Sequence, residues 1–195
     1  VPSTSRYKNM ADLAQAAKAG PGAVNYGSWF VGSPGHIGAA MLETATSSRM
    51  THIPYKEMSQ LYAAVGTQEV DWAFGSAASA GGMQRAGKLR YLAVAAPRRV
   101  AGFPDVPTVA ESGGPAGFEL GAWTALLAPK GTPKAVVEKI QKDLASVLAN
   151  PEVREKFAAM YYEPFPANTD QFLRQLRDDT QRYGDTIKRL NISLD

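Results

Sequence analysis

The chain has 195 residues, of which 45% are hydrophobic and 20% are charged, the profile of a packed globular protein rather than of a disordered one. Its 21 basic and 18 acidic residues are interspersed, and no basic stripe with interleaved aromatic residues is present, so we expect no nucleic-acid partner. Without cysteine, and with His36 and His52 as the only histidines, thiol catalysis and disulfides are excluded and a metal centre is not expected. We also expect no cofactor.

Helical and strand-like segments alternate along most of the chain, which predicts an α/β fold with largely parallel strands. The first element is a helix over 8–19, which ends at a Gly-Pro-Gly sequence. The following predicted elements are a strand over 23–26, a helix over 34–46, a strand over 50–53 closed by Pro54, a short helix over 59–65, a strand over 69–75, a helix over 76–86, and strands over 89–96 and 120–129.

The last two strands are joined by a long connection over 97–119 that is rich in proline and glycine. Within it, the stretch TVAESG predicts one helical turn, and the length favours a crossover between two lobes. The tail predicts three amphipathic helices: one capped by Thr132 and Pro133, a second after a break at Asn150-Pro151, and a third over 168–190. We interpret the apolar stripe of the first of these helices as a packing face rather than a partner groove; it comprises Val136, Val137, Ile140, Leu144, Val147 and Leu148.

The stretch VNYGSWFVGSPGHIGAAMLE carries the first candidate binding site. Residues 27–33 are predicted to be a loop, with Ser33 as the cap and Pro34 as the first residue of the helix that follows. The free N–H groups and the positive dipole end of this helix favour a carboxylate or a phosphate. A serine at this position is usually just a helix cap, which does not exclude a ligand above it.

A second loop, at Gly75 and Ser76, precedes another predicted helix, so both loops belong to the edge where the strands end. Trp29 and Phe30 stand in the first loop either as a surface cap over the core or as walls of a pocket. The glycines do not fit a dinucleotide or P-loop motif, and no serine lies in a G-x-S-x-G elbow. We therefore interpret His36 as a packing or capping histidine rather than a general base, and His52 as structural.

Several motifs in this order closely resemble the Bug family, the extracytoplasmic solute receptors of tripartite tricarboxylate transporters. They are VNYGS with VGSPGHIGAAMLE, THIPYKEMSQLYAAVGTQEVDWAF, AGKLRYLAVAAPRR, FPDVPTVAESG, APKGTPKAVV and NPEVREKF. The resemblance runs from Val1 to the C-terminus. It implies a periplasmic binding protein-like fold of type II, in which two lobes close on a small carboxylate or related metabolite, and it implies no chemistry.

The resemblance also implies the arrangement of the lobes and the setting of the protein. Residues 3–100 would form an inserted, doubly wound ligand-binding lobe, and residues 101–195 would supply the crossover, a strand and the C-terminal helices of a second, incomplete lobe. Family members begin with a strand and a glycine-rich loop that this chain lacks, so we expect it to be N-terminally incomplete. A periplasmic location, a signal peptide that has been removed, and membrane transporter subunits as partners are implied as well.

Carrying the family's site over to matching positions gives a set of expected ligand-binding residues: Ser28, Gly32, Ser33, His36, Gly75 and Ser76, with Trp29 and Phe30 as walls. Trp29 and Phe30 replace residues that are usually small in the family, and Gly75 stands where an aspartate is common. Loss of an acid reduces discrimination in favour of an amine, so we expect a plain carboxylate or an aromatic acid rather than an amino acid.

Two alternatives remain open from the sequence. The chain can be a truncated, ligand-free remnant that acts only as a folded, self-associating module, pairing as a homodimer to cover apolar surface. A hydrolase is the less favoured alternative, since no nucleophile and base are paired in a known motif.

Overall fold

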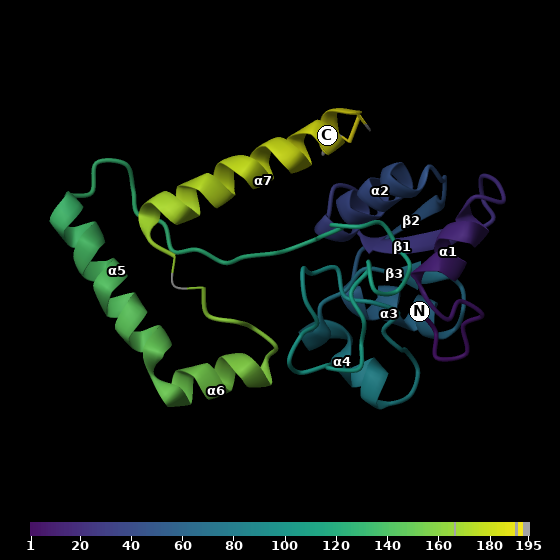
Figure 1. Ribbon diagram of the computed structural model, residues 1–195, viewed down its shortest axis with the longest axis horizontal. Coiled ribbons are helices and arrows are strands. Elements are labelled where there is room, and N and C mark those ends of the chain that lie inside the picture. Colours follow the sequence, from purple (N-terminus) through teal and green to yellow (C-terminus); the bar gives the residue numbers. More distant parts are fainter. Residues whose placement is uncertain (166, 190, 193–195) are drawn as a thin grey trace. The chain divides into compact units, whose positions relative to one another are not determined.

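The computed structural model describes residues 1–165, 167–189 and 191–192, and its contacts divide the chain into two compact units. One unit comprises Val1–Gly121 with Arg182–Asp195, and the other comprises Ala122–Gln181. Figure 1 shows the elements in order: α1 (Met10–Ala17), β1 (Asn25–Trp29), α2 (Pro34–Thr46), β2 (Thr51–Tyr55), α3 (Met58–Gly66), β3 (Trp72–Ala73), α4 (Ala77–Arg85), α5 (Lys134–Ala149), α6 (Pro151–Ala159) and α7 (Thr169–Arg189).

The first unit is built on a parallel sheet with the strand order β2-β1-β3, which confirms the predicted α/β class. Strand β1 lies in the centre and pairs with β2 from Asn25↔Thr51 to Trp29↔Tyr55. Helices α1 and α2 contribute to the core on one face, whereas α3 and α4 contribute to the core on the other. This placement of helices on both faces is the doubly wound arrangement expected from the sequence.

Strand β1 occupies residues 25–29 rather than the predicted 23–26, so Gly27, Ser28 and Trp29 lie in the strand and not in a loop. The reason is the long register with β2, which continues to the pair Trp29↔Tyr55. Pro54 does not close β2 as predicted, because β2 is an edge strand of this sheet and can include a residue without an N–H group.

Helix α2 has the bounds that the sequence predicts, because its start is set by local chemistry. The side chain of Ser33 accepts a hydrogen bond from the N–H of His36, and Pro34 occupies the first turn. Helices α1, α3 and α4 match their predictions more loosely. Helix α1 begins two residues later than predicted because Asn9 caps it by accepting from the N–H of Asp12.

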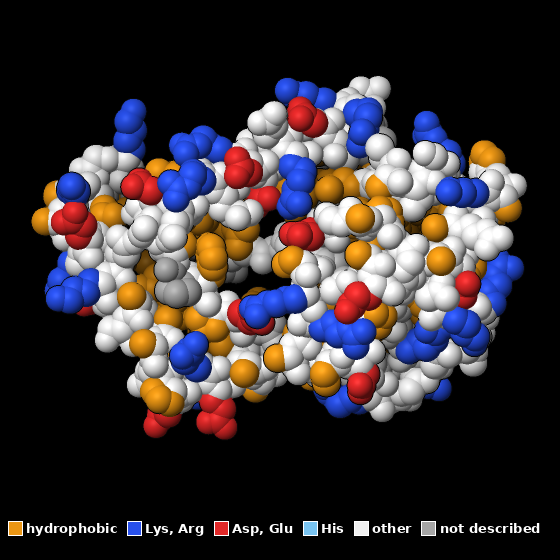
Figure 2. Space-filling view, in the orientation of Figure 1, with side chains coloured by type: hydrophobic (Ala, Val, Ile, Leu, Met, Phe, Trp, Pro, Cys, Tyr) orange, Lys and Arg blue, Asp and Glu red, His pale blue; other side chains and the backbone are white. Residues whose placement is uncertain are grey.

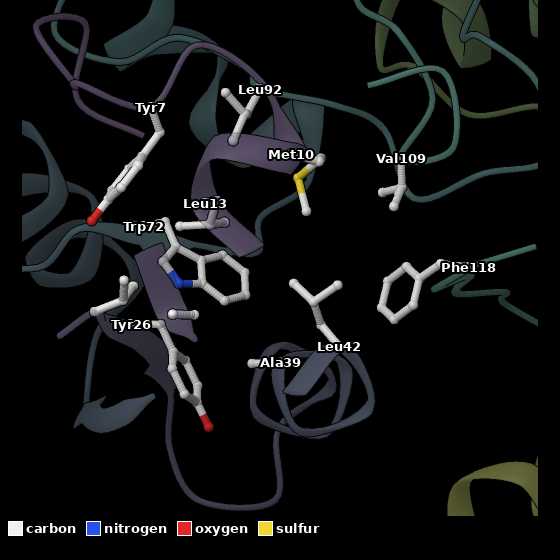
Figure 3. Close-up of a cluster of buried hydrophobic side chains, with 12 residues drawn as sticks. Tyr7, Met10, Leu13, Tyr26, Ala39, Leu42, Trp72, Leu92, Val109 and Phe118 are labelled. Atoms are coloured by element: carbon white, nitrogen blue, oxygen red, sulfur yellow. The ribbon is translucent and has the colours of Figure 1, made fainter. Parts of the chain in front are cut away.

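The main hydrophobic core lies between the sheet and the helices α1 and α2 (Figure 3). Tyr26 of β1 and Trp72 of β3 are paired neighbours in the sheet and both belong to this core, where the Trp72 ring lies between Leu13 and Leu42. The next residues along the strands face the opposite core under α3, which contains Leu61, Tyr62, Ala64, Val65, Val70, Ala80 and Leu89. The alternation of a strand thus separates the two cores.

Three predicted strands are shorter than expected or do not form. Strand β3 has two residues instead of seven, and the apolar run 89–96 makes only the isolated bridges Pro2↔Leu89 and Val94↔Thr108. Its residue Leu92 is nevertheless buried in the main core, as predicted, whereas the predicted strand does not form. The prediction for 120–129 is wrong for the described residues, where Leu126 and Leu127 are 69% and 76% exposed and no strand pairs with this segment.

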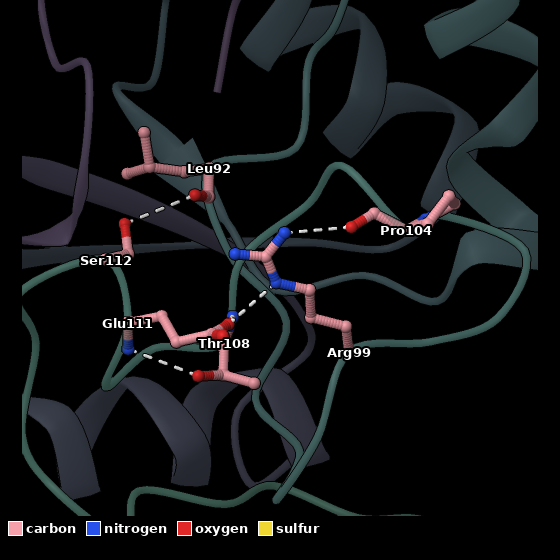
Figure 4. A network of polar contacts seen from close by, with 6 residues as sticks. All are labelled: Leu92, Arg99, Pro104, Thr108, Glu111 and Ser112. Carbon is pink, nitrogen blue, oxygen red and sulfur yellow. Dashed lines mark hydrogen bonds and ion pairs between the residues drawn. The ribbon is translucent and has the colours of Figure 1, made fainter.

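The connection after residue 96 contains the predicted helical turn, held by a capping box. The backbone N–H of Thr108 donates to the Glu111 carboxylate, and the N–H of Glu111 donates back to the Thr108 hydroxyl (Figure 4). Arg99 pairs with Glu111 at 2.9 Å and donates to the carbonyl of Pro104, while Ser112 donates to the carbonyl of Leu92. The lobe boundary predicted at residues 100–101 lies inside the first unit.

The second unit holds α5, α6 and most of α7. The break at Asn150-Pro151 is confirmed: Asn150 caps α6 by accepting from the N–H of Glu152, with Pro151 in the first turn. Helix α5 begins after Pro133 without a side-chain cap, because the Thr132 hydroxyl donates to the carbonyl of Pro129 instead. The predicted third helix forms as α7, and the last residue of that prediction, Leu190, lies outside the described residues.

The apolar stripe of α5 does not form the predicted packing face. No residue of α5 or α6 is buried, and Val136, Ile140, Leu144 and Val147 are between 40% and 53% exposed. Figure 2 shows hydrophobic side chains between interspersed acidic and basic ones on this part of the surface. Among the described helices, none combines the length and the apolar character that crossing a bilayer needs.

Candidate functional site

The two loops predicted to form a site lie side by side at the carboxyl edge of the sheet. Strand β1 leads into α2 through residues 30–33, and β3 leads into α4 through residues 74–76. A Cβ atom built on Gly35, in the first turn of α2, would lie 3.7 Å from the Cβ atoms of both Ser28 and Phe74. Two helix N-termini and their loops therefore converge on one place, as parallel α/β sheets arrange them for ligands.

The first loop is a tight turn from Phe30 to Ser33. The N–H of Ser33 donates to the carbonyl of Phe30 at 3.4 Å, and the third residue, Gly32, has φ 82°, as a type II turn requires. Phe30 itself has φ 60°, a left-handed conformation that aromatic residues rarely adopt. The turn follows β1 directly, since the N–H of Phe30 still donates to the carbonyl of Tyr55.

A stacked pair of histidines lies against this turn. The rings of His36, from α2, and His52, from β2, have centroids 4.0 Å apart and are inclined by 5°. Nδ1 of His36 accepts a hydrogen bond from the N–H of Gly32 at 3.0 Å. Nε2 of His52 lies 2.6 Å from the hydroxyl of Ser28, which also donates to the carbonyl of Phe30. Both histidines thus contact the backbone or the side chain that shapes the turn.

Both rings are neutral near pH 7. The pKa of His52 is lowered to about 4, mainly by burial and to a smaller extent by the neighbouring His36. Burial also lowers the pKa of His36. A neutral His36 is required by its geometry as well, because Nδ1 can accept from Gly32 only while it carries a lone pair.

The second loop carries a chain of hydroxyl groups. Ser76 caps α4 by accepting from the N–H of Ser79 at 3.1 Å, and the two serine hydroxyls lie 2.7 Å apart. Ser79 in turn lies 2.6 Å from the hydroxyl of Tyr62, whose pKa is raised by burial. Gly75 packs directly against Tyr62: a Cβ built on it would lie 2.5 Å from that hydroxyl.

The two unexpected aromatic residues lie at the surface beside the first turn. Trp29 is 45% exposed and Phe30 is 43% exposed, and their rings meet edge to face at 5.0 Å. The indole N–H of Trp29 donates to the carbonyl of Lys56. Their position is compatible with walls of a site, and their role stays a prediction.

The expected site residues differ in how accessible they are. The side chains of Ser28 and Ser33 are 0% and 1% exposed, and both hydroxyls are bonded within the protein. Gly75 and Ser76 are exposed, and Gly32 and His36 are partly buried. Sequence reasoning missed the part played by His52, Tyr62 and Ser79. His52 reaches the site through the strand register, which places it beside Tyr26. Tyr62 reaches it because α3 packs under the second loop.

The contact between Ser28 and His52 has the distance of a nucleophile and its base, but its surroundings do not suit catalysis. A nucleophile must reach its substrate, whereas Ser28 is enclosed and donates to Phe30. A base with a pKa near 4 is also poorly matched to neutral pH. Within the described ranges, no group of three or more histidine and carboxylate side chains could hold a metal ion.

Comparison with known proteins shows the family to which the chain is similar. A model described as "Tripartite tricarboxylate transporter family receptor" matches residues 1–192. The chain belongs to this receptor family. The Bordetella pertussis protein BugT is 31% identical over 189 residues, which are 93% of this chain and 56% of BugT.

Solved structures show the fold of the receptor family. An R. palustris protein with adipate has a TM-score of 0.83 and 25% identity, covering 99% of this chain and 64% of that chain. The periplasmic binding protein BugD has a TM-score of 0.76 and 27% identity, covering 98% and 64% of the two chains. The predicted Bug-type family and periplasmic binding protein-like fold are thereby confirmed. The chain spans little more than half of BugT and about two thirds of the solved chains.

Proposed function

We propose that the chain is a solute-binding receptor, or the site-bearing part of one, that captures a small carboxylate for a tripartite tricarboxylate-type transporter. The observation that carries the proposal is the convergence of two capped helix N-termini, those of α2 and α4, at the end of a parallel sheet. Both present backbone N–H groups and positive dipole ends, which favour an anion. The family match supports the same function, and so does the R. palustris neighbour with adipate.

The ligand class that we favour is a plain carboxylate without an amine. An amine needs a nearby acid or acceptor, and the position next to Ser76 is Gly75, whose Cα faces the Tyr62 hydroxyl. Ser28 and Ser33 act by shaping the first turn, since their hydroxyls are enclosed, whereas Ser76 is exposed and can donate to a ligand oxygen. Trp29 and Phe30 supply apolar contact beside the turn.

The setting that we propose follows from the family. The receptor works in the periplasm, delivers its ligand to membrane transporter subunits, and performs no chemistry, in line with the enclosed position of Ser28. Self-association stays a separate prediction. The exposed stripe of α5 supports it, and the mass measured by size exclusion at several concentrations tests it.

Calorimetry tests the proposed ligand class. Adipate, benzoate and glutamate are titrated into the wild-type chain, and we expect the carboxylates without an amine to bind more tightly. Ser76→Ala is expected to weaken binding by about tenfold, the effect of one lost hydrogen bond to a charged group. The matched control is Asn150→Ala, which removes the cap of α6 in the other unit and should leave binding unchanged. Equal affinities of the wild type and Ser76→Ala, or preference for glutamate, would contradict the assignment.

A further inference from the structure

The stacked histidines are connected to the candidate site in a way that the binding of an anion does not require. His36 accepts from the backbone of Gly32, and His52 contacts Ser28, so the pair holds the turn Phe30–Ser33 at two places. We propose that His36 and His52 are positioning residues whose neutral rings hold this turn in its binding conformation, and that protonation of His36 releases the turn and lowers ligand affinity. The predicted loss of affinity rests on the proposed function, whereas the predicted release of the turn is independent of it.

The hydrogen bond between Gly32 and His36 exists in only one protonation state. Nδ1 of His36 accepts, so its lone pair is free and the ring proton is on Nε2. A second proton on the ring must go to Nδ1, where it would face the N–H of Gly32. Two donors then point at one another, and Gly32 loses its acceptor.

The stacking makes protonation a property of the pair. The rings are nearly parallel with centroids 4.0 Å apart, so a charge on one ring opposes a charge on the other. His36 also lies in the first turn of α2, where the positive end of the helix dipole opposes a cation. Burial lowers the pKa of both groups, and the effect of His36 on His52 indicates that His36 takes up the first proton.

Among the described residues, no ion pair joins an acidic side chain to either ring. The ionisable side chains on the packed elements include Tyr26 on β1, Glu43 further along α2, Tyr55 on β2, Tyr62 on α3 and Asp71 at the start of β3. Burial raises the pKa of Glu43, and its carboxylate accepts from the N–H of Met50. Asp71 accepts from the N–H of Asn25 at the other end of the strands.

The turn is poised to move once its acceptor is lost. Phe30 adopts φ 60°, a strained conformation for an aromatic residue, and such strain persists only where the surrounding contacts enforce it. The carbonyl of Phe30 is held by Ser28, which in turn contacts His52. Protonation of His36 therefore removes the acceptor of Gly32 at one end of the turn while the strain at the other end remains.

NMR of the isotope-labelled chain tests the release without a ligand. We expect the amide signal of Gly32 to shift between about pH 7.5 and pH 4.5, with the same midpoint as the ring protons of His36. His36→Asn places a non-titrating acceptor near the position of Nδ1, and the shift of Gly32 should be lost in it. The control signal is the amide of Gly87, which donates to the carbonyl of Gln84 and should not follow the histidine midpoint.

The results that overturn the proposal are equally specific. A Gly32 amide that does not titrate with His36, or that titrates unchanged in His36→Asn, contradicts it. Should His36→Asn fail to fold, the wild-type comparison of Gly32 with His36 still decides. His36→Asn also tests the coupling: the midpoint of His52 should rise in it, because the charge of His36 that lowers the pKa of His52 is gone, and an unchanged midpoint contradicts the coupling.

Adipate binding tests the effect on affinity. On lowering the pH from about 7.5 to about 5, we expect the wild type to lose roughly tenfold more affinity for adipate than His36→Asn. The protonation of adipate itself is the same in both experiments and cancels in the comparison. Equal losses contradict the link to affinity. If adipate does not bind at the higher pH, the proposed function fails for this ligand, while the amide titration still decides whether the turn is released.

Discussion

Leu61 of α3 lies directly over Gly27 of β1, so closely that a Cβ atom on Gly27 would collide with its Cδ1. The contact explains why glycine occupies the middle of the central strand, where it is otherwise unfavourable. It brings α3 against the sheet, and α3 carries Tyr62, which supports the second loop of the candidate site. The spacing between helix and strand thus sets part of the site.

Gly27→Ala is expected to destabilise the protein by about 1–3 kcal/mol, the usual effect of overpacking a core. The free energy of unfolding from urea titration measures this. The control is Gly82→Ala in α4, because a Cβ at Gly82 meets no atom within 4 Å. That change should be neutral or stabilise by up to about 1 kcal/mol. Similar effects of the two substitutions would contradict the close packing of Leu61.

Gly75 and Tyr62 are expected to be energetically coupled. Gly75→Ala would place a methyl group against the Tyr62 hydroxyl, and Tyr62→Phe would remove that hydroxyl. The double variant should therefore be less destabilised than the sum of the single variants, by about 0.5–3 kcal/mol. A double-mutant cycle on the free energy of unfolding measures the coupling, and strict additivity would show that the contact carries no energy.

The capping box in the connection gives a third prediction. Thr108→Ala removes the hydroxyl that accepts from Glu111 and is expected to lower the free energy of unfolding by about 1 kcal/mol. Arg99→Ala removes only an exposed ion pair and should have a smaller effect. Thermal unfolding of both variants checks the order. A larger loss for Arg99→Ala would mean that the ion pair, rather than the cap, holds the turn.

The free energy of unfolding is expected to decrease as the pH is lowered, because of His52. The pKa of His52 is lowered from 6.5 to about 4, so the unfolded chain binds a proton that the folded chain does not. This contribution is fully present above pH 6.5 and is lost as the pH falls toward about 4. His52→Gln should have a flatter dependence of unfolding free energy on pH in this window. A slope equal to that of the wild type would contradict the assignment to His52.

The sequence predicted those elements whose ends are set by local chemistry. Ser33 and Pro34 define the start of α2, and Asn150 and Pro151 define the start of α6, so both were predicted correctly. The end of β1 was not, because it depends on the register with β2. The apolar run 89–96 has the composition of a buried strand, but a strand also needs a partner along its length, and it makes only isolated bridges.

The candidate site was predicted in the same uneven way. The two helix starts can be read from Ser33 and Ser76 and from the apolar spacing that follows them. The stacking of His36 on His52 cannot be predicted from the sequence, since the two residues are far apart along the chain and meet only when β2 pairs with β1. The enclosed position of the Ser28 hydroxyl likewise depends on the strand continuing to Trp29.

The most direct measurement is an NMR titration of the isotope-labelled chain with adipate, raised to about 1 mM, at neutral pH. If the carboxylate binds between the starts of α2 and α4, the amide signals of Gly32, Ser33, Gly75 and Ser76 should shift together and saturate, while those of α6 stay unchanged. Shifts confined to other parts of the chain, or none among the signals of the two loops, would contradict a carboxylate site at this edge of the sheet.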